Sequence, residues 1–216
     1  MGATAEHEDT VVKPRSAASD GSFTARLRVE TRGEHEAIER NRRLRRLTET
    51  DLGVEEYVSV LARLAGFLGP VETELHRWAG RFSRSLDLDA RLTKADLLGR
   101  DLAALAPGFD GRVSALAAPF AGLATFERAW GCLYVFEGAT LGGQILARSL
   151  HAQLGLTADR GTAFYNAYGK QTGARWKAFK AALNASVAED GLDPDEIIAG
   201  ARATFQSMNA WMDADA

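Results

Sequence analysis

The sequence predicts an all-α protein that folds as a single domain. Long stretches carry apolar residues at helical spacing, alternating patterns typical of strands are almost absent, and no repeat period appears. The chain has 216 residues, of which 46% are hydrophobic and 25% are charged, an ordinary globular composition. Residues 1–21 mix small and charged residues without periodicity. We therefore expect a flexible tail over 1–21 and one helical domain over 22–216.

Each helix of this domain is expected from residues that start or stop helices. Ser, Thr and Asp favour helix N-caps, whereas Gly and Pro favour helix ends. In the first half, these signals predict one helix from Ser22 or Thr24 to about residue 45, one from Asp51 that Gly69-Pro70 interrupts, a resumed stretch over 71–86, and one from Thr93 to just before Pro107. In the second half, they predict a long helix from Thr125 to about Leu154, one over 163–189, and one over 194–212 that Asp193-Pro194 begins.

Charge and cysteine content exclude several classes of function. The net charge of −3 gives no general attraction to nucleic acids or anionic membranes. No apolar run approaches the roughly 18 residues of a membrane-spanning helix. The single cysteine, Cys132, forms neither an internal disulfide nor a cysteine-rich zinc site. We expect a cytoplasmic protein that binds neither nucleic acid nor membrane.

A histidine lies among cationic residues in the first helical stretch. At 100° per residue, Arg28, Arg32, His35 and Glu39 share a face about 60° wide. A solvated helix face is the ordinary interpretation of such a pattern, with ion pairs one turn apart. In this stretch, such pairs would join Arg32, Glu36 and Arg40.

A ligand site is the second interpretation of the same face. His35 would give one imidazole nitrogen to a metal, and Glu39 would steady its surroundings directly or through water. Arg28 and Arg32 would pair with anionic groups of the same ligand. A cofactor with one axial metal position and two carboxylates meets this demand, and haem is the obvious candidate.

The long helix over 125–154 contains glycines where each weakens a helix by about 0.5–1 kcal/mol relative to alanine. Gly138, Gly142 and Gly143 fall within six residues. Close packing against another helix would explain Gly138 and Gly142, which share a face. A kinked helix whose bare backbone approaches a flat ligand would explain all three. Both interpretations remain open at this point.

Together, the two stretches resemble the haem oxygenase family. Thr31-Arg-x-x-His35-x-x-x-Glu39 resembles its proximal helix, and the stretch Leu133–Gln144 resembles its distal helix in the bacterial Glu-Gly-x-x-Leu-Gly-Gly form. The likeness extends from about Phe23 to Trp211. It implies a multi-helical bundle that holds haem between the proximal helix and a kinked, glycine-rich distal helix.

This resemblance implies roles for individual residues. His35 would be the proximal ligand of the haem iron, and Glu39 matches the acid one turn beyond it. The other implied haem contacts are Arg28, Arg32 and Lys177 at the propionates, with Arg175 or Lys180 as substitutes for Lys177; Gly138, Gly142 and Gly143 over the porphyrin; and Phe136, Leu141 and Phe205 at the pocket walls. Animal-type members carry a distal aspartate where this sequence has Ala139. Glu137 and Thr140 are the remaining candidates to organise distal water.

The activity implied by the resemblance is cleavage of haem by O2 to biliverdin, CO and ferrous iron. The sequence has no flavin, dinucleotide or iron–sulfur motif, so we expect a ferredoxin or a flavoprotein reductase as the electron donor. Family analogy adds a phytochrome that uses the bilin. The arginines of residues 40–46 are either a solvated helix end or a docking surface for an acidic ferredoxin. The alternatives are a haem carrier or sensor without turnover, and a bundle that has lost haem.

Overall fold

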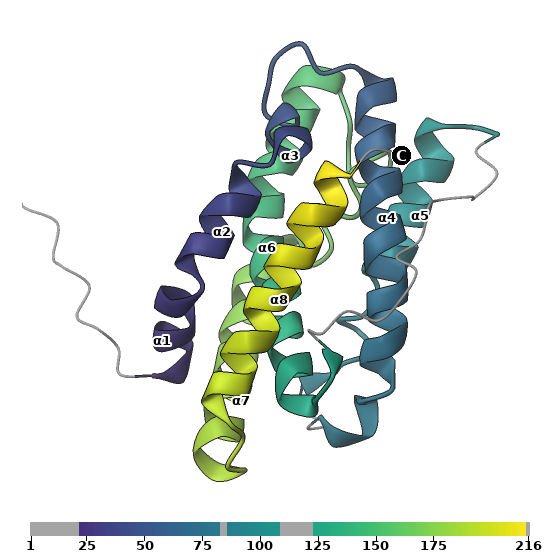
Figure 1. The fold of residues 1–216 in the computed structure, drawn as a ribbon. Helices are drawn as coiled ribbons and strands as arrows, with labels where there is room; N and C mark the ends of the chain where they lie inside the picture. Colours follow the sequence, from purple (N-terminus) through teal and green to yellow (C-terminus); the bar gives the residue numbers. More distant parts are fainter. Residues whose placement is uncertain (1–21, 83–85, 109–122, 215–216) are drawn as a thin grey trace, which may run out of the picture.

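The computed structural model describes residues 22–82, 86–108 and 123–214, so the expected tail over 1–21 lies outside the described residues. Within these ranges the chain is helical apart from turns, loops and two isolated bridges at Thr157, which confirms the all-α prediction. The elements, drawn in Figure 1, are α1 (Phe23–Glu30), α2 (Arg32–Glu39), α3 (Arg42–Arg46), α4 (Val54–His76), the 3₁₀ turn η1 (Ala79–Arg81), α5 (Lys94–Leu105), α6 (Phe126–Leu154), the 3₁₀ turn η4 (Gly169–Gln171), α7 (Thr172–Glu189) and α8 (Pro194–Asp213).

Helix α6 is the central element of the bundle. It packs most extensively against α8, while α4 packs on α5 and the α1–α3 segment follows one side of α8 (Figure 1). Two glycines allow the α6–α8 contact. A methyl group on Gly131 of α6 would collide with the backbone of α8 at Ile197 and Ala201, and one on Gly200 would collide with the backbone of Arg128. These positions admit no side chain, so the two helix axes come unusually close.

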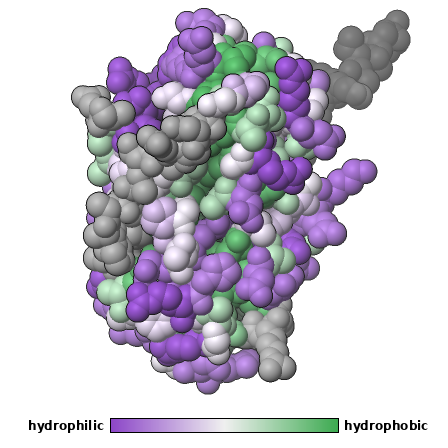
Figure 2. Space-filling view, turned by 90° about the vertical axis from the view of Figure 1, so that its right-hand side faces the viewer, coloured by the Kyte–Doolittle hydropathy of each residue, from purple (hydrophilic) through white to green (hydrophobic). Residues whose placement is uncertain are grey.

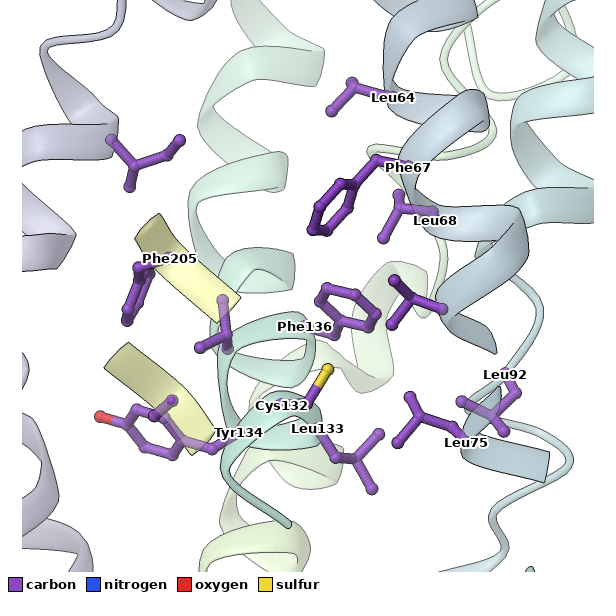
Figure 3. Close-up of a cluster of buried hydrophobic side chains, with 14 of the residues drawn as sticks. Leu64, Phe67, Leu68, Leu75, Leu92, Cys132, Leu133, Tyr134, Phe136 and Phe205 are labelled. Carbon is purple, nitrogen blue, oxygen red and sulfur yellow. The ribbon is translucent and has the colours of Figure 1, made fainter. Parts of the chain in front are cut away.

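The hydrophobic core lies between α4 and α6. Leu64, Phe67, Leu68 and Leu75 of α4 face Cys132, Leu133 and Phe136 of α6 (Figure 3). On the opposite side of α6, Tyr134 lies beside α8, which carries Phe205 (Figure 3). Viewed from the α4 and α5 side, the molecule shows green apolar surface mainly near the top, among purple hydrophilic residues (Figure 2). None of the helices in the described ranges combines the length and apolarity needed to cross a bilayer.

The first expected helix is divided into three. Ser22 caps α1 as predicted, accepting a hydrogen bond from the Ala25 amide at 3.4 Å. The helix then breaks at Thr31, whose hydroxyl donates to the Leu27 carbonyl at 2.8 Å. A second break lies at Asn41, whose side chain caps α3 and also donates to Asp213 of α8 at 2.8 Å. The prediction of one continuous helix to residue 45 is wrong, because these polar side chains compete for backbone groups and for α8.

The predicted interruption at Gly69-Pro70 is also wrong. Helix α4 begins at Val54 and continues through Pro70 to His76. Proline costs about 3 kcal/mol in a helix interior because it lacks an amide hydrogen and crowds the preceding turn. Phe67, Leu68 and Val71 are buried around this position, and their burial offsets the cost. Over residues 77–82, part of the helix expected over 71–86, the chain forms turns and η1, and residues 83–85 lie outside the described residues.

The remaining caps confirm most of the sequence predictions. Thr125 accepts from the Arg128 amide at 3.2 Å to begin α6, and Asp193 accepts from the Asp195 amide at 2.8 Å to begin α8. At α5, Thr93 occupies the N-cap position without a side-chain bond. Glu72 of α4 performs the capping instead, accepting from the amide of Lys94 at 2.8 Å.

Helix α7 begins at Thr172 and not at residue 163. Residues 163–168 form turns instead, because the buried Asp101 carboxylate accepts from the Ala163 and Phe164 amides at 2.8 and 2.9 Å. Gly169 then has a φ of +50°, a left-handed conformation that suits glycine.

Candidate functional site

His35 lies in the first turns of α2 with its side chain 57% exposed. Its Nδ1 is 3.5 Å from Glu39 Oε1, one turn further along the helix. The imidazole also meets the Phe205 ring of α8 edge-on, with the centroids 5.6 Å apart. Among the described residues, Nε2 has no hydrogen-bond partner, so this nitrogen remains available to an external ligand.

Helix α8 holds α2 in place along its length. Arg202 donates to the Glu30 carbonyl at 2.7 Å and lies 3.6 Å from the Glu34 carboxylate. Further along, Asn41 donates to the side chain of Asn209 at 3.0 Å. Fixed points before and after His35 therefore limit how far its helix moves relative to α8.

The opposing wall is the middle of α6, where one face is uncovered. We call Gly138, Leu141, Gly142 and Ile145 the open face of α6; they lie three or four residues apart, and Leu141 and Ile145 are 41% and 60% exposed. A methyl group built on Gly142 meets no atom within 4 Å. One on Gly138 meets only the Trp176 ring, at 3.7 Å, which is ordinary contact.

These contacts separate the two interpretations of the glycines. Gly131 is required by helix packing, and Gly143 faces away from the open face, with its added methyl 3.1 Å from the Tyr165 carbonyl. Neither packing against another helix nor contact with a neighbouring carbonyl explains Gly142, because a methyl group added there meets no atom within 4 Å. Close packing therefore does not require glycine at 138 or 142, whereas a surface that admits a flat ligand would.

The two walls of the candidate site, His35 on α2 and the open face of α6, lie at about the same height along the bundle. Helices α2 and α6 run in the same direction (Figure 1), and the Thr31 side chain lies close enough to the Tyr134 hydroxyl of α6 to oppose the rise in the pKa of that hydroxyl. His35 lies one turn beyond Thr31, and Gly138 lies one turn beyond Tyr134, about 6 Å along each helix. Sequence analysis missed Tyr134, because nothing in its spacing distinguishes it from a core aromatic residue.

Cationic side chains surround this region. Arg28 and Arg32 are exposed, and neither forms a salt bridge with a residue that the structure describes. Arg28 lies close enough to Tyr134 to oppose the rise in the pKa of that hydroxyl, which burial causes. Both guanidinium groups are therefore available to pair with anionic groups of a ligand.

The three candidate cations of α7 lie in different surroundings. Arg175 is directed toward Asp87, at 3.7 Å, and its guanidinium lies over the Tyr168 ring. Lys177 is exposed. The Nζ of Lys180 lies 5.7 Å from the centre of the Trp176 ring, and that ring is the neighbour of Gly138. Of the three, Lys180 is thus directly linked to the open face of α6.

The other expected wall and water-organising residues are dispersed. Phe136 lies in the core facing α4 and is 3% exposed (Figure 3). Glu137 is turned inward and is 1% exposed, and the Thr140 hydroxyl donates to its carbonyl at 2.6 Å. Ala139 is exposed. The carboxylate of Glu137 therefore does not lie on the open face of α6.

The side chains available at this site fit a metal ion whose other ligands come from a bound cofactor. In the described ranges, no cluster of three or more His, Cys, Asp or Glu side chains is placed to hold an ion. A porphyrin supplies the equatorial ligands of its iron and needs one axial side chain. His35 with a free Nε2, an uncovered glycine backbone and nearby cations together fit haem.

The described residues form a helical bundle with a candidate ligand site between α2 and α6, both of which contact α8. The family model for haem oxygenase matches residues 21–214, and the chain belongs to the haem oxygenase family. The search of curated proteins found no match.

Solved structures share the fold at low sequence identity. Haem oxygenase from Leptospira interrogans has a TM-score of 0.68 and 19% identity, over 88% of this chain and 98% of its own. The NO- and CO-bound haem oxygenase from Neisseria meningitidis has a TM-score of 0.67 and 21% identity, over 88% and 90%. Haem oxygenase 2 from Chlamydomonas reinhardtii, without haem, has a TM-score of 0.65 and 20% identity, over 89% and 97%.

Proposed function

We propose that this protein is a haem oxygenase that cleaves haem with O2 to biliverdin, CO and ferrous iron. The observation that carries the proposal is the pairing of His35, with its free Nε2, and Gly142, with its uncovered backbone, on two helices that run in the same direction and both contact α8. Haem supplies the oxygen-activating iron and is also the substrate.

On the proximal side, His35 Nε2 binds the iron. The carboxylate of Glu39 near Nδ1 favours a proton on that nitrogen, which leaves Nε2 as the neutral donor. The edge of Phe205 limits rotation of the imidazole. A neutral imidazole donates less electron density to the iron than a thiolate does, and it therefore favours attack on the porphyrin over cleavage of the O–O bond.

Cations at the edge of the site orient the haem ring within its own plane. Arg28 and Arg32 on the α1–α2 side, with Lys177 or Lys180 on α7, pair with the propionates. Placement beside Trp176 favours Lys180 over Lys177. The rotation that these charges set decides which meso carbon is attacked.

On the distal side, the backbone of Gly138 and Gly142 leaves room for the ring and for O2, whereas Gly143, expected there from the sequence, packs against Tyr165. Helix α6 itself places no carboxylate on its open face, because Glu137 is turned inward and residue 139 is alanine. Protons therefore reach the site through water held by backbone groups. Electrons come from a ferredoxin or a flavoprotein reductase, and a phytochrome is a candidate user of the bilin.

The arginines of residues 40–46 give limited support to docking of an acidic donor. Three of the five are already engaged: Arg46 with Glu49, Asp51 and Glu56; Arg43 with the carbonyls of Met212 and Ala214; and Arg40 with Glu36 at 3.7 Å. Arg42 and Arg45 are exposed on the surface. Any docking patch here is therefore small.

Ala139 favours one alternative, a haem carrier or sensor with the same fold that does not turn haem over. The experiment that separates the two binds haem without oxygen and then adds air and a reductant. An enzyme loses its Soret band as a bilin band grows in the red. A carrier retains its haem spectrum, and a protein with no Soret shift on adding haem contradicts both proposals.

A further inference from the structure

Behind the open face of α6, a buried cluster of ion pairs anchors the helix at Glu137, next to Gly138. The Glu137 carboxylate pairs with Arg91, lies 3.2 Å from Lys94 Nζ and accepts from the Tyr168 hydroxyl at 2.7 Å. Glu137, Arg91 and Lys94 are each 3% exposed or less. A buried carboxylate is stable only with such partners, so its position is closely defined.

The segment that carries Tyr168 contacts α6 a second time, two turns further along that helix. Gly143 faces the Tyr165 backbone, and the Gln144 amide donates to the Tyr165 carbonyl at 3.5 Å. We call residues 161–168, together with Glu137, Arg91 and Lys94, the rear brace. Its two contacts flank the glycines of the open face.

The rear brace is itself fixed to α4 and α5. Tyr57 of α4 donates to the Gly161 carbonyl at 2.7 Å, and Asp101 of α5 accepts from two amides of the segment. Movement of the glycine stretch would therefore have to break charged or buried hydrogen bonds that lead back to the core.

Glycines weaken this part of α6, and the open face gives it no packing on one side. A helical stretch with few buried contacts and glycine at several positions opens locally at little free-energy cost. We propose that Glu137 is a positioning residue, which acts through the rear brace to keep the glycine stretch of α6 helical before any ligand binds. The inference deepens the proposed function, because its purpose is a haem-binding surface formed in advance.

Hydrogen exchange on the full chain without haem tests the role of Glu137. Glu137→Gln keeps the size of the side chain but removes the charge that pairs with Arg91 and Lys94. We expect amides of residues 138–147 to exchange at least about tenfold faster, as loss of charge-assisted hydrogen bonds predicts, while amides of α8 near Ile197 keep their rate. Unchanged exchange over 138–147, or equal acceleration in α4 and α8, overturns the proposal.

Two further variants help to interpret this experiment, one as a control and one as a second test. Glu196→Gln removes a more exposed carboxylate from an Arg pair, with Arg128 at 2.7 Å, away from the open face, and should leave residues 138–147 unchanged. Tyr168→Phe removes one hydroxyl from the cluster and leaves its charges unchanged. If Glu137→Gln does not fold, a local acceleration in Tyr168→Phe supports the proposal, and its absence overturns it.

The rate of haem association separates this inference from the proposed function. We expect haem to bind Glu137→Gln with the same Soret position as the wild type, because His35 is untouched, but to associate several-fold more slowly. Wild-type protein that binds no haem contradicts the proposed function even where the exchange result holds. Wild-type binding with unaltered association in Glu137→Gln contradicts only the role of Glu137.

Discussion

Gly131 and Gly142 lie on the same helix but meet opposite surroundings. Alanine at Gly131 would collide with the α8 backbone, whereas alanine at Gly142 has free space. Alanine is the better helix former by up to about 1 kcal/mol. Gly142→Ala should therefore raise the free energy of unfolding of the haem-free protein and weaken haem binding about tenfold or more, by filling the space that the ring occupies. Thermal unfolding and haem titration measure both effects.

Gly99→Ala is the matched control for this pair of effects. Gly99 is exposed in the interior of α5, also with no atom within 4 Å of an added methyl group, but it lies outside the proposed site. It should show the gain in stability with unchanged haem affinity. Gly142→Ala with unchanged haem affinity would remove the open face of α6 from the haem site.

His35 gives a second prediction at the scale of single residues. His35→Ala removes the proposed axial ligand, and the haem spectrum of the wild type should be lost and then recovered on adding free imidazole. His76→Ala is the control, since His76 is exposed on α4 and lies 3.9 Å from Asp89. A His35→Ala protein whose haem spectrum matches the wild type would rule out ligation by His35.

Sequence spacing indicated candidate site residues but did not show which way each side chain is directed. The glycine pattern indicated something unusual in α6, yet only tertiary contacts distinguish Gly131 and Gly143, which face neighbours, from Gly142, which does not. Glu137 was a candidate for distal water, and the structure turns it toward Arg91. The direction of a side chain depends on partners distant in sequence, which periodicity does not reveal.

At the scale of helices, α7 distinguishes two neighbouring lysines. Lys180 lies beside the Trp176 ring next to Gly138, and Lys177 lies about 100° further round the helix from Trp176. Lys180→Gln should lower haem affinity about two- to fivefold, as expected for a solvent-exposed ion pair, with a smaller effect at high salt. The same change at Lys177 should have less effect, and the reverse order would assign the propionate contact to Lys177.

The connection between α3 and α4 predicts a dependence of stability on pH. Hydrogen bonds from Arg46 lower the pKa of Asp51 and Glu56 relative to their ordinary values of 3.8 and 4.5. The unfolded chain then binds more protons than the folded protein below about pH 4.5, so stability falls as the pH falls.

Arg46→Gln checks this dependence. Without the guanidinium, the two carboxyls should titrate similarly in folded and unfolded protein, and denaturant midpoints should fall less steeply between pH 5 and 3 than in the wild type. Parallel curves for the two proteins would show that this cluster does not contribute.

Helix ends show which local signals suffice. Ser22, Thr125 and Asp193 were predicted as caps and act as caps, because the cap and its amide are close in sequence. The breaks at Thr31 and Asn41 and the continuity of α4 through Pro70 were not predicted. These depend on α8 and on core burial, which outweigh local preference.

At the scale of the whole molecule, α8 connects the two walls of the site. It contacts α2 through Phe205 and Arg202, and it contacts α6 at Gly131 through its own Gly200. One helix therefore fixes the separation of His35 from the open face of α6. The all-α class and the positions of α5, α6 and α8 followed from the sequence, whereas this common support became evident only in three dimensions.

The central claim is that the protein consumes the haem that His35 holds. Its most direct test is CO release, trapped by myoglobin, from haem-loaded protein in air with ferredoxin, its reductase and NADPH. We predict CO equimolar with the haem lost, together with a red bilin band, and no such release from His35→Ala. A wild-type protein that keeps its haem spectrum and releases no CO would contradict the account.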